Sequence, residues 1–334
     1  MNSLELEKVV PFDQYSRQFQ VSIILKILKK NKKPLAILDV GGYKGRSKDF
    51  LPSDDVTVVD LYDIKEEGYV RGSGFDLPFP FRSFDFVVSF DTLEHIPVNK
   101  RDNFIEECER VAKRGIIICA PNKTPENELI EEKLNDLYKK LHHKSHRWLE
   151  EHMEYKIPDF DLLEKKVQEH GIFTNRFYSN KSQLWFLMQQ AIFMNSKFTF
   201  GAEKLIELNE FYNKNFKYDG GGSDITSYRQ ILCGLENEDE STNLNKAMSK
   251  FNNPIEPLIE LELIEKINDY FTTLIIKTAQ QSKNYEDLYM FNMNLAEERE
   301  KINKNLQTRI NQYEKLLPAK IIIKTKQMLR KVKK

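Results

Sequence analysis

The sequence predicts a doubly wound α/β fold, in which a mostly parallel sheet carries helices on both faces. Four short apolar runs rich in β-branched or aromatic residues are bounded by turn residues, as buried strands are, at residues 35–40, 56–59, 84–90 and 116–119. Segments long enough for crossover helices separate them, most clearly at residues 101–114. A glycine-rich turn directly follows the first run, as is typical of a strand that leads into a helix beside a ligand.

Composition excludes several classes of protein. Lys plus Arg and Asp plus Glu balance at 51 each, so no overall field attracts the chain to nucleic acid or to an anionic membrane. Cys108, Cys119 and Cys233 show no paired spacing, and we expect reduced core residues. The N-terminus lacks the basic start and apolar run of a secretory signal, and nothing approaches the ~20 apolar residues of a membrane span. We therefore expect a cytoplasmic protein.

Three parts are predicted along the chain: a main domain at residues 1–235, a polar linker at 236–256 and a helical extension at 257–334. Within the main domain, a helix at 17–33 leads into the first strand. The charged segment 123–156 is predicted to be helical, and further strands are expected at 173–179 and 227–232. The other expected elements are helices at 183–194 and 202–213 and a glycine turn at 220–222.

The helical extension has a narrow apolar stripe, which suits a coiled coil between two chains and hence a homo-oligomer; it comprises Ile302, Leu306, Ile310, Tyr313 and Leu317. The last sixteen residues hold seven Lys or Arg and no acidic residue. Apolar and basic residues are mixed there, which favours a helix on the inner face of a membrane or against a partner helix. A solvated tail is the close alternative, and nucleic acid is the least favoured partner.

The stretch ILDVGGYKGR at residues 37–46 is the most informative. A buried strand ends at Asp39, and Gly41, Gly42 and Gly45 let the backbone turn sharply and approach a ligand. The glycine spacing differs from the dinucleotide pattern GxGxxG, so pyrophosphate binding is disfavoured. The second strand ends at Asp60, where a carboxylate can accept hydrogen bonds from both hydroxyls of an unphosphorylated ribose.

Two further motifs follow, GFDLPF at residues 74–79 and SFDFVVSFDTLEH at residues 83–95. With the glycine turn and Asp60, they resemble the class I S-adenosylmethionine-dependent methyltransferases, in particular the type 11-like small-molecule branch. The resemblance covers residues 35–122. It implies a seven-stranded Rossmann-like methyltransferase sheet, S-adenosylmethionine as cofactor and methyl transfer to a small polar acceptor.

The resemblance also implies roles for single residues. It places the methionine moiety at Asp39 and the turn from Gly41 to Gly45, the ribose at Asp60, the adenine at Asp76 and the Leu77 backbone, and the reacting centre above Ser89 and Asp91. One departure concerns Tyr43, which stands where the family usually has its middle glycine. Its ring either packs over the methionine moiety or blocks the site.

A hydroxyl acceptor needs a base, and His95 is the candidate because an imidazole titrates near neutral pH. Glu94 and Asp91 are weaker candidates that would orient the loop. The alternative for His95 is a loop-capping role, with the ring bonded to a backbone carbonyl.

Four of the six histidines crowd into residues 142–152, namely His142, His143, His146 and His152. His142 and His146 share a helical face, but no cysteine is nearby and Lys and Arg intervene. We therefore predict a charged lid helix and no metal. The segment resembles those of methyltransferases from surface-polysaccharide clusters, in which Trp148 and Tyr155 would stack on a sugar or simply pack.

The leading hypothesis is thus a cytoplasmic methyltransferase, with a saccharide hydroxyl among the candidate acceptors. Sequence patterns of DNA base methyltransferases are absent. The first rival is a scaffold that retains the fold without turnover, which Tyr43 and the helical tail suggest. The second is an NAD-type oxidoreductase, which the glycine spacing disfavours.

Overall fold

The computed structural model describes residues 3–43, 46–198, 201–217, 226–251 and 257–281, with scattered positions between 293 and 308. The chain forms two compact units, Met1–Glu256 and Pro257–Lys334. In the second unit the described helix is α11 (Pro257–Gln281). The predicted apolar stripe and basic C-terminal segment lie outside the described residues, so pairing and membrane contact stay predictions. No described helix has both the length and the apolar character needed to span a bilayer.

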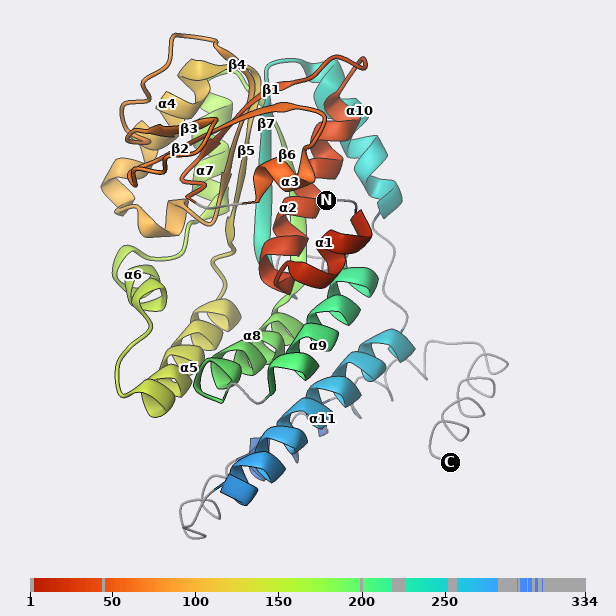
Figure 1. The fold of residues 1–334 in the computed structure, drawn as a ribbon. Coiled ribbons are helices and arrows are strands. Elements are labelled where there is room, and N and C mark those ends of the chain that lie inside the picture. The colour runs from red at the N-terminus through yellow and green to blue at the C-terminus, as the bar shows by residue number, and fades with distance from the viewer. Residues whose placement is uncertain are drawn as a thin grey trace. The chain divides into compact units, whose positions relative to one another are not determined.

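A seven-stranded sheet forms the centre of the first unit, in the order β3-β2-β1-β4-β5-β7-β6 (Figure 1). The strands are β1 (Ala36–Val40), β2 (Asp55–Asp60), β3 (Tyr69–Arg71), β4 (Phe84–Phe90), β5 (Ala112–Pro121), β6 (Phe173–Lys181) and β7 (Ser227–Leu235). Neighbouring strands run parallel except around β7, which is antiparallel to β5 and β6. This confirms the doubly wound, mostly parallel sheet.

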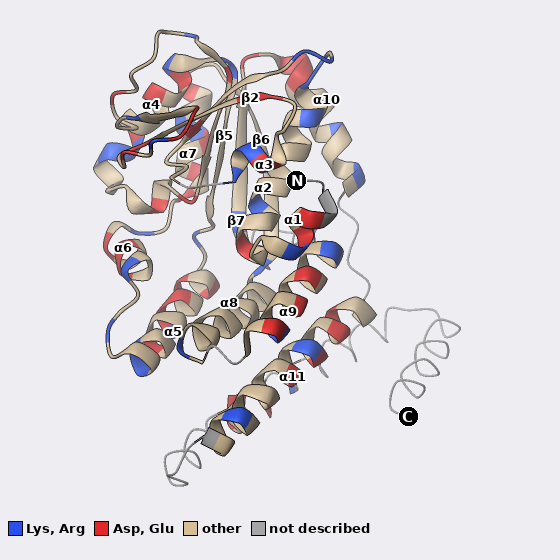
Figure 2. Cartoon of the chain, viewed as in Figure 1, with Lys and Arg blue, Asp and Glu red and all other residues tan. Residues whose placement is uncertain are grey.

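Helices cover both faces of the sheet because its central strands are apolar on both sides. One face packs against α4 (Arg101–Val111) and α7 (Phe160–Glu169), and the other against α2 (Phe12–Leu28) and α10 (Glu238–Met248). Figure 2 shows the acidic and basic residues mainly on the helices, whereas the strands are largely free of them. All three cysteines are buried and free, as predicted.

A group of helices lies beyond the edge at which β5 ends (Figure 1). It comprises α5 (Pro125–His142), α6 (Arg147–Tyr155), α8 (Ser182–Lys197) and α9 (Ala202–Asn215). The start of α5 is well defined by its sequence. The Thr124 side chain caps the helix by accepting a hydrogen bond from the Asn127 amide, and Pro125 occupies the first turn. The remaining short elements are α1 (Ser3–Val9), α3 (Ser47–Phe50) and the 3₁₀ turns η1 (Leu93–His95), η2 (Val98–Lys100) and η5 (Ser249–Phe251).

The structure differs from the sequence prediction at several elements. The segment expected as a polar linker contains α10, whose Leu244 and Met248 enter the core, and the first unit extends to Glu256. The helix expected through Arg114 ends at Val111 because β5 begins at Ala112, which pairs with Phe84 of β4. β3 and α7 had no clear sequence signal, and the glycine turn at 220–222 lies outside the described residues.

Candidate functional site

The predicted cofactor residues meet at one edge of the sheet, where β1, β2 and β4 end. β1 lies between the other two strands, so Asp39, Asp60 and Ser89 come from three adjacent strands. Carboxyl ends of parallel strands form the crevice in which open α/β sheets bind ligands. The described part of the turn between β1 and α3, Gly41 to Tyr43, borders this edge; Gly45 lies outside the described residues.

The first two glycines allow contacts that a side chain would prevent. Gly41 has a φ of +79°, and a Cβ atom there would lie 2.5 Å from Oγ1 of Thr92. At Gly42, a Cβ atom would lie 2.6 Å from Oδ2 of Asp39. The turn therefore packs directly on the loop after β4 and over the carboxylate of β1.

The Gly41→Ala variant is expected to lose cofactor affinity and about 1 to 3 kcal/mol more stability than Gly171→Ala. Gly171 has nearly the same φ of +77°, but nothing lies within 4 Å of its hypothetical Cβ. The control thus measures backbone strain alone, while Gly41→Ala adds the clash with Thr92. Urea denaturation and cofactor titration of both variants test this, and equal losses would show that Thr92 simply moves aside.

Asp39 is the least satisfied polar group of this edge. Its side chain is buried, with 1% exposure of the residue, and neither oxygen has a hydrogen-bond partner in the described structure. Burial raises the pKa of Asp39 to about 6, although Ser47 and Arg17 act in the opposite direction. A buried carboxylate without a partner is costly. This group therefore suits a ligand that brings a cation, as the ammonium of a methionine moiety does.

Asp60 is already engaged by the backbone of the neighbouring loops. Oδ2 accepts a hydrogen bond from the Tyr43 amide at 2.9 Å, and Oδ1 accepts one from the Tyr62 amide at 3.1 Å. Each oxygen retains acceptor capacity for a ribose hydroxyl. The Tyr43 ring is 46% exposed and meets the Tyr62 ring edge-on at 5.0 Å, so its contact is with Tyr62 at the surface.

The predicted adenine contacts are only partly available. The Leu77 amide, expected to face the adenine, donates to Oε2 of Glu107 at 2.7 Å, and the Leu77 carbonyl accepts from Arg110 at 2.9 Å. Both backbone groups therefore already have partners in this structure. Asp76 is exposed.

Ser89 ties two strands together. It is buried, and its hydroxyl donates to the Val40 carbonyl at 2.9 Å. The serine thus holds the end of β4 against the end of β1 and shapes the floor of the site by this contact.

Asp91, predicted as a weak base candidate, lies in an ion-pair network with Asp13, Arg17 and Arg229. Arg229 donates to it through Nε at 2.8 Å and Nη2 at 2.6 Å, and Arg17 donates to Oδ2. Asp13 pairs with both arginines, at 2.7 Å from Arg229 and 3.2 Å from Arg17. The two arginines hold the pKa of Asp91 well below its usual range against the effect of burial, so Asp91 is ionised and serves structure, not proton transfer.

Glu94 and His95 occupy η1, the turn after Asp91, against which α6 packs. Glu94 is fully buried and its carboxyl oxygens have no partner among the described residues. Burial and the charge of Asp91 raise the pKa of Glu94 to about 8. Burial and His152 lower the pKa of His95, so that its imidazole is neutral at neutral pH, as a general base requires.

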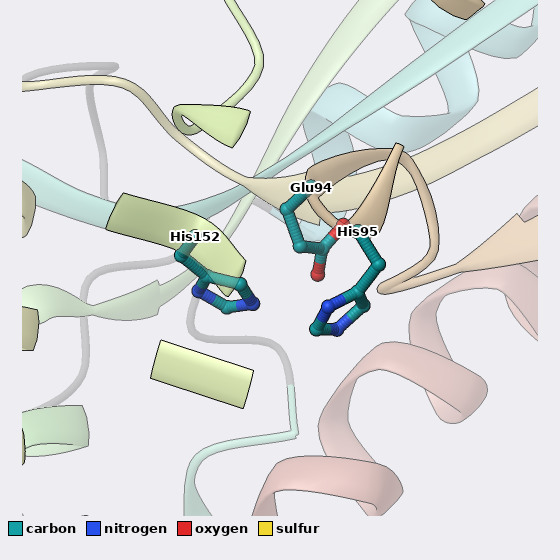
Figure 3. Close-up of side chains that lie close together, drawn as sticks. All are labelled: Glu94, His95 and His152. Carbon is teal, nitrogen blue, oxygen red and sulfur yellow. The ribbon is translucent and has the colours of Figure 1, made fainter. Parts of the chain in front are cut away.

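Figure 3 shows His152 of α6 lying beside Glu94 and His95. The His95 and His152 ring centroids are 4.8 Å apart. Sequence reasoning placed His152 in a lid cluster and gave no sign that it would meet η1. Two other histidines of that cluster behave differently: His142 lies 2.9 Å from the Ser196 hydroxyl, and His146 packs on aromatic rings.

Comparison with known proteins identifies the domain. Residues 39–120 match a family model described as a methyltransferase domain. No curated protein matched the chain. The match overlaps the residues in which Asp39, the glycine turn and η1 lie, and S-adenosylmethionine is the cofactor of such a domain. Asp39, without a hydrogen-bond partner among the described residues, and the close-packed Gly41 and Gly42 fit that cofactor's methionine moiety.

Solved structures with a similar arrangement include a magnesium protoporphyrin IX methyltransferase from Synechocystis PCC 6803 with bound S-adenosylhomocysteine. It is 13% identical, with 71% of this chain and 89% of that chain covered, at a TM-score of 0.41. A SAM-dependent methyltransferase from Aquifex aeolicus is 14% identical, with 71% and 94% covered, at a TM-score of 0.37. Such distant likenesses carry no inference about the acceptor.

Proposed function

We propose that this chain transfers a methyl group from S-adenosylmethionine to a hydroxyl of a small polar acceptor, with saccharides the favoured class. One observation carries the proposal: the buried carboxylate of Asp39, which has no hydrogen-bond partner among the described residues, lies beneath Gly42, at the edge from which the loop after β4 starts. A cationic ligand would satisfy that carboxylate. The loop after β4 continues into η1, which carries Glu94 and His95.

S-adenosylmethionine, when bound, supplies an already activated methyl group, so the protein's task is mainly alignment. Asp39 would hold the ammonium of the methionine moiety and Asp60 the ribose hydroxyls. Thr92 packs against Gly41 and so links the cofactor turn to η1. The polar side chains of Glu94, His95 and His152 would face the acceptor.

The saccharide class is supported by α6. Trp148 on this helix is 62% exposed, and the same helix carries Glu151 and His152. An exposed indole face beside carboxylate and imidazole groups suits a ligand with one apolar face and several hydroxyls. Tyr155, the other aromatic predicted to stack, is half-buried at the end of α6.

Replacing Asp60 by alanine is expected to weaken binding of S-adenosylhomocysteine at least about tenfold, because hydrogen bonds to a charged acceptor are lost. Isothermal titration measures this. Asp63→Ala removes an exposed aspartate three residues away and is the matched control. Unchanged affinity of Asp60→Ala would contradict the proposed cofactor site.

The non-catalytic scaffold is the second candidate, because the Leu77 amide and both Asp60 oxygens already have partners. Cofactor binding without transfer of a labelled methyl group to any hydroxyl compound in a saccharide panel would favour it. The same titration with NAD tests the oxidoreductase alternative.

A further inference from the structure

We infer that Glu94, His95 and His152 form a binding site for a divalent transition-metal ion. Each offers one donor atom, and the three donor atoms lie within 4.8 Å of one another (Figure 3). Glu94 and His95 come from η1 and His152 from α6, so the packing of α6 on η1 assembles the site. Donors around one ion at about 2.1 Å are about 3 to 4 Å apart, so small side-chain rotations would close the site.

The donor atoms of Glu94 and His152 have no other partner among the described residues. Both carboxyl oxygens of Glu94 and Nε2 of His152 are buried and make no hydrogen bond within the described structure, whereas Nδ1 of His95 is paired with Oε2 of Glu151. Glu94 is 0% exposed and His152 is 7% exposed. Native proteins rarely leave so many neighbouring buried polar atoms unsatisfied. A bound cation would satisfy them together.

The surroundings of His152 prepare it for this role. Its Nδ1 lies 3.0 Å from Oε1 of Glu131, which also accepts a hydrogen bond from the Tyr228 hydroxyl at 2.7 Å. In the neutral form of His152 that donates from Nδ1 to Glu131, the lone pair is on Nε2. A carboxylate behind a ligating histidine is the usual support of metal sites.

Glu151 stands close to the same cluster. Its Oε2 pairs with Nδ1 of His95 at 2.8 Å, which leaves Nε2 of His95 for an ion, and its Oε1 accepts from Arg147 at 2.9 Å. This carboxylate is placed to supply a further oxygen to the ion or to orient the His95 ring. His95 is 27% exposed at its side chain, which leaves the site open toward solvent on that side.

The donor set selects the class of ion. Two imidazole nitrogens and one carboxylate oxygen suit Zn²⁺, Mn²⁺, Fe²⁺ or Co²⁺, whereas Mg²⁺ and Ca²⁺ prefer oxygen ligands. Three protein ligands leave positions free for an outside ligand, as in catalytic metal sites.

The use of the ion rests on the proposed function. An acceptor hydroxyl coordinated by the ion would have a lowered pKa and release its proton to solvent. The oxygen then forms the bond to the methyl carbon while the carbon–sulfur bond breaks, and that electron pair stays on the sulfur of S-adenosylhomocysteine. The ion would thus perform the activation that the sequence assigned to His95 as a base.

Titration of the full-length, chelator-treated protein with Co²⁺ tests the site through visible absorption and calorimetry. We expect one ion per chain, and at least 100-fold weaker binding in Glu94→Gln and in His152→Gln. Glu131→Gln should weaken binding about 10- to 100-fold, as loss of a supporting carboxylate does. His170→Gln is the control, since His170 pairs with Glu109 at 2.6 Å and belongs to α7's end, not to this cluster.

Loss of Co²⁺ binding in Glu94→Gln can be distinguished from unfolding, because the replaced carboxyl group has no hydrogen-bond partner among the described residues and the metal-free variant should stay folded. Thermal denaturation of the variant checks this. Wild-type Co²⁺ binding weaker than millimolar, or Co²⁺ affinity in Glu94→Gln and His152→Gln equal to that of the wild type, would overturn the inference. S-adenosylhomocysteine titration of the metal-free protein separates the two proposals. Cofactor binding without metal binding rejects only the metal site, and metal binding without cofactor binding rejects only the proposed function.

Discussion

Replacing Arg229 by methionine is expected to lower the free energy of unfolding by about 3 to 5 kcal/mol, the usual cost of removing one partner of a buried ion pair. Arg229 is 2% exposed and contacts both Asp91 and Asp13. Its removal leaves the half-buried carboxylates of Asp13 and Asp91 paired with Arg17 alone. Urea denaturation at neutral pH measures the loss.

Arg82→Met is the matched control for this prediction. Arg82 also forms a two-pronged pair, with Glu236 at 2.6 and 2.9 Å, but both side chains are 42% exposed. Exposed pairs contribute about 0 to 1 kcal/mol, so this variant should retain nearly full stability. Equal losses of unfolding free energy in Arg229→Met and Arg82→Met would show that burial of Arg229 does not strengthen its ion pairs.

The network also predicts a pH dependence. The pKa of Asp91 is depressed in the folded protein, so its contribution is complete above its unfolded pKa of about 4 and is lost as pH falls below that value. Stability of the wild type should therefore fall on acidification. Arg229→Met, which lacks one of the two arginines that lower the pKa of Asp91, should show a shallower fall.

Replacing Asp39 by asparagine is expected to weaken cofactor binding about 10- to 100-fold, since a charge-assisted hydrogen bond contributes about 1.5 to 3 kcal/mol. The same variant should be more stable than the wild type at pH 8. Burial raises the pKa of Asp39 from 3.8 to about 6, so keeping it charged at pH 8 costs about 3 kcal/mol in the folded state. If Asp39→Asn is more stable than the wild type but binds the cofactor more weakly, the carboxylate of Asp39 serves ligand binding at the expense of stability.

The sign of the pH effect follows from the same raised pKa. The destabilisation by Asp39 grows as pH rises from about 4 to about 6, and the charged form that attracts an ammonium dominates only above about 6. Wild-type affinity for S-adenosylmethionine should therefore fall as pH drops from 7 to 5, and that of Asp39→Asn should stay flat. Asp102→Asn, at an exposed position of α4, is the control. A parallel fall in both variants would contradict the assignment.

Local sequence patterns were sufficient to predict a helix or strand where that element is long or strongly apolar. The runs that became β1, β2, β4 and β5 were visible because strands buried on both faces are continuously apolar. β3 has only three residues, and α10 shows few apolar residues among polar ones, so neither stood out. Leu244 of α10 is nonetheless fully buried, because α2 and the sheet provide its partners.

The sequence by itself determined the parallel strands at the centre of the sheet, the turn at Gly41 and Gly42, and the positions of Asp39 and Asp60 near the ends of β1 and β2. These features depend on residues that are neighbours in the chain. Only the tertiary structure decided what each carboxylate does. Asp91 pairs with arginines from α2 and β7, while the carboxyl groups of Asp39 and Glu94 are buried without a hydrogen-bond partner in the part of the chain that the structure describes. Charge, burial and pKa depend on which distant segments pack together, and no local pattern carries that information.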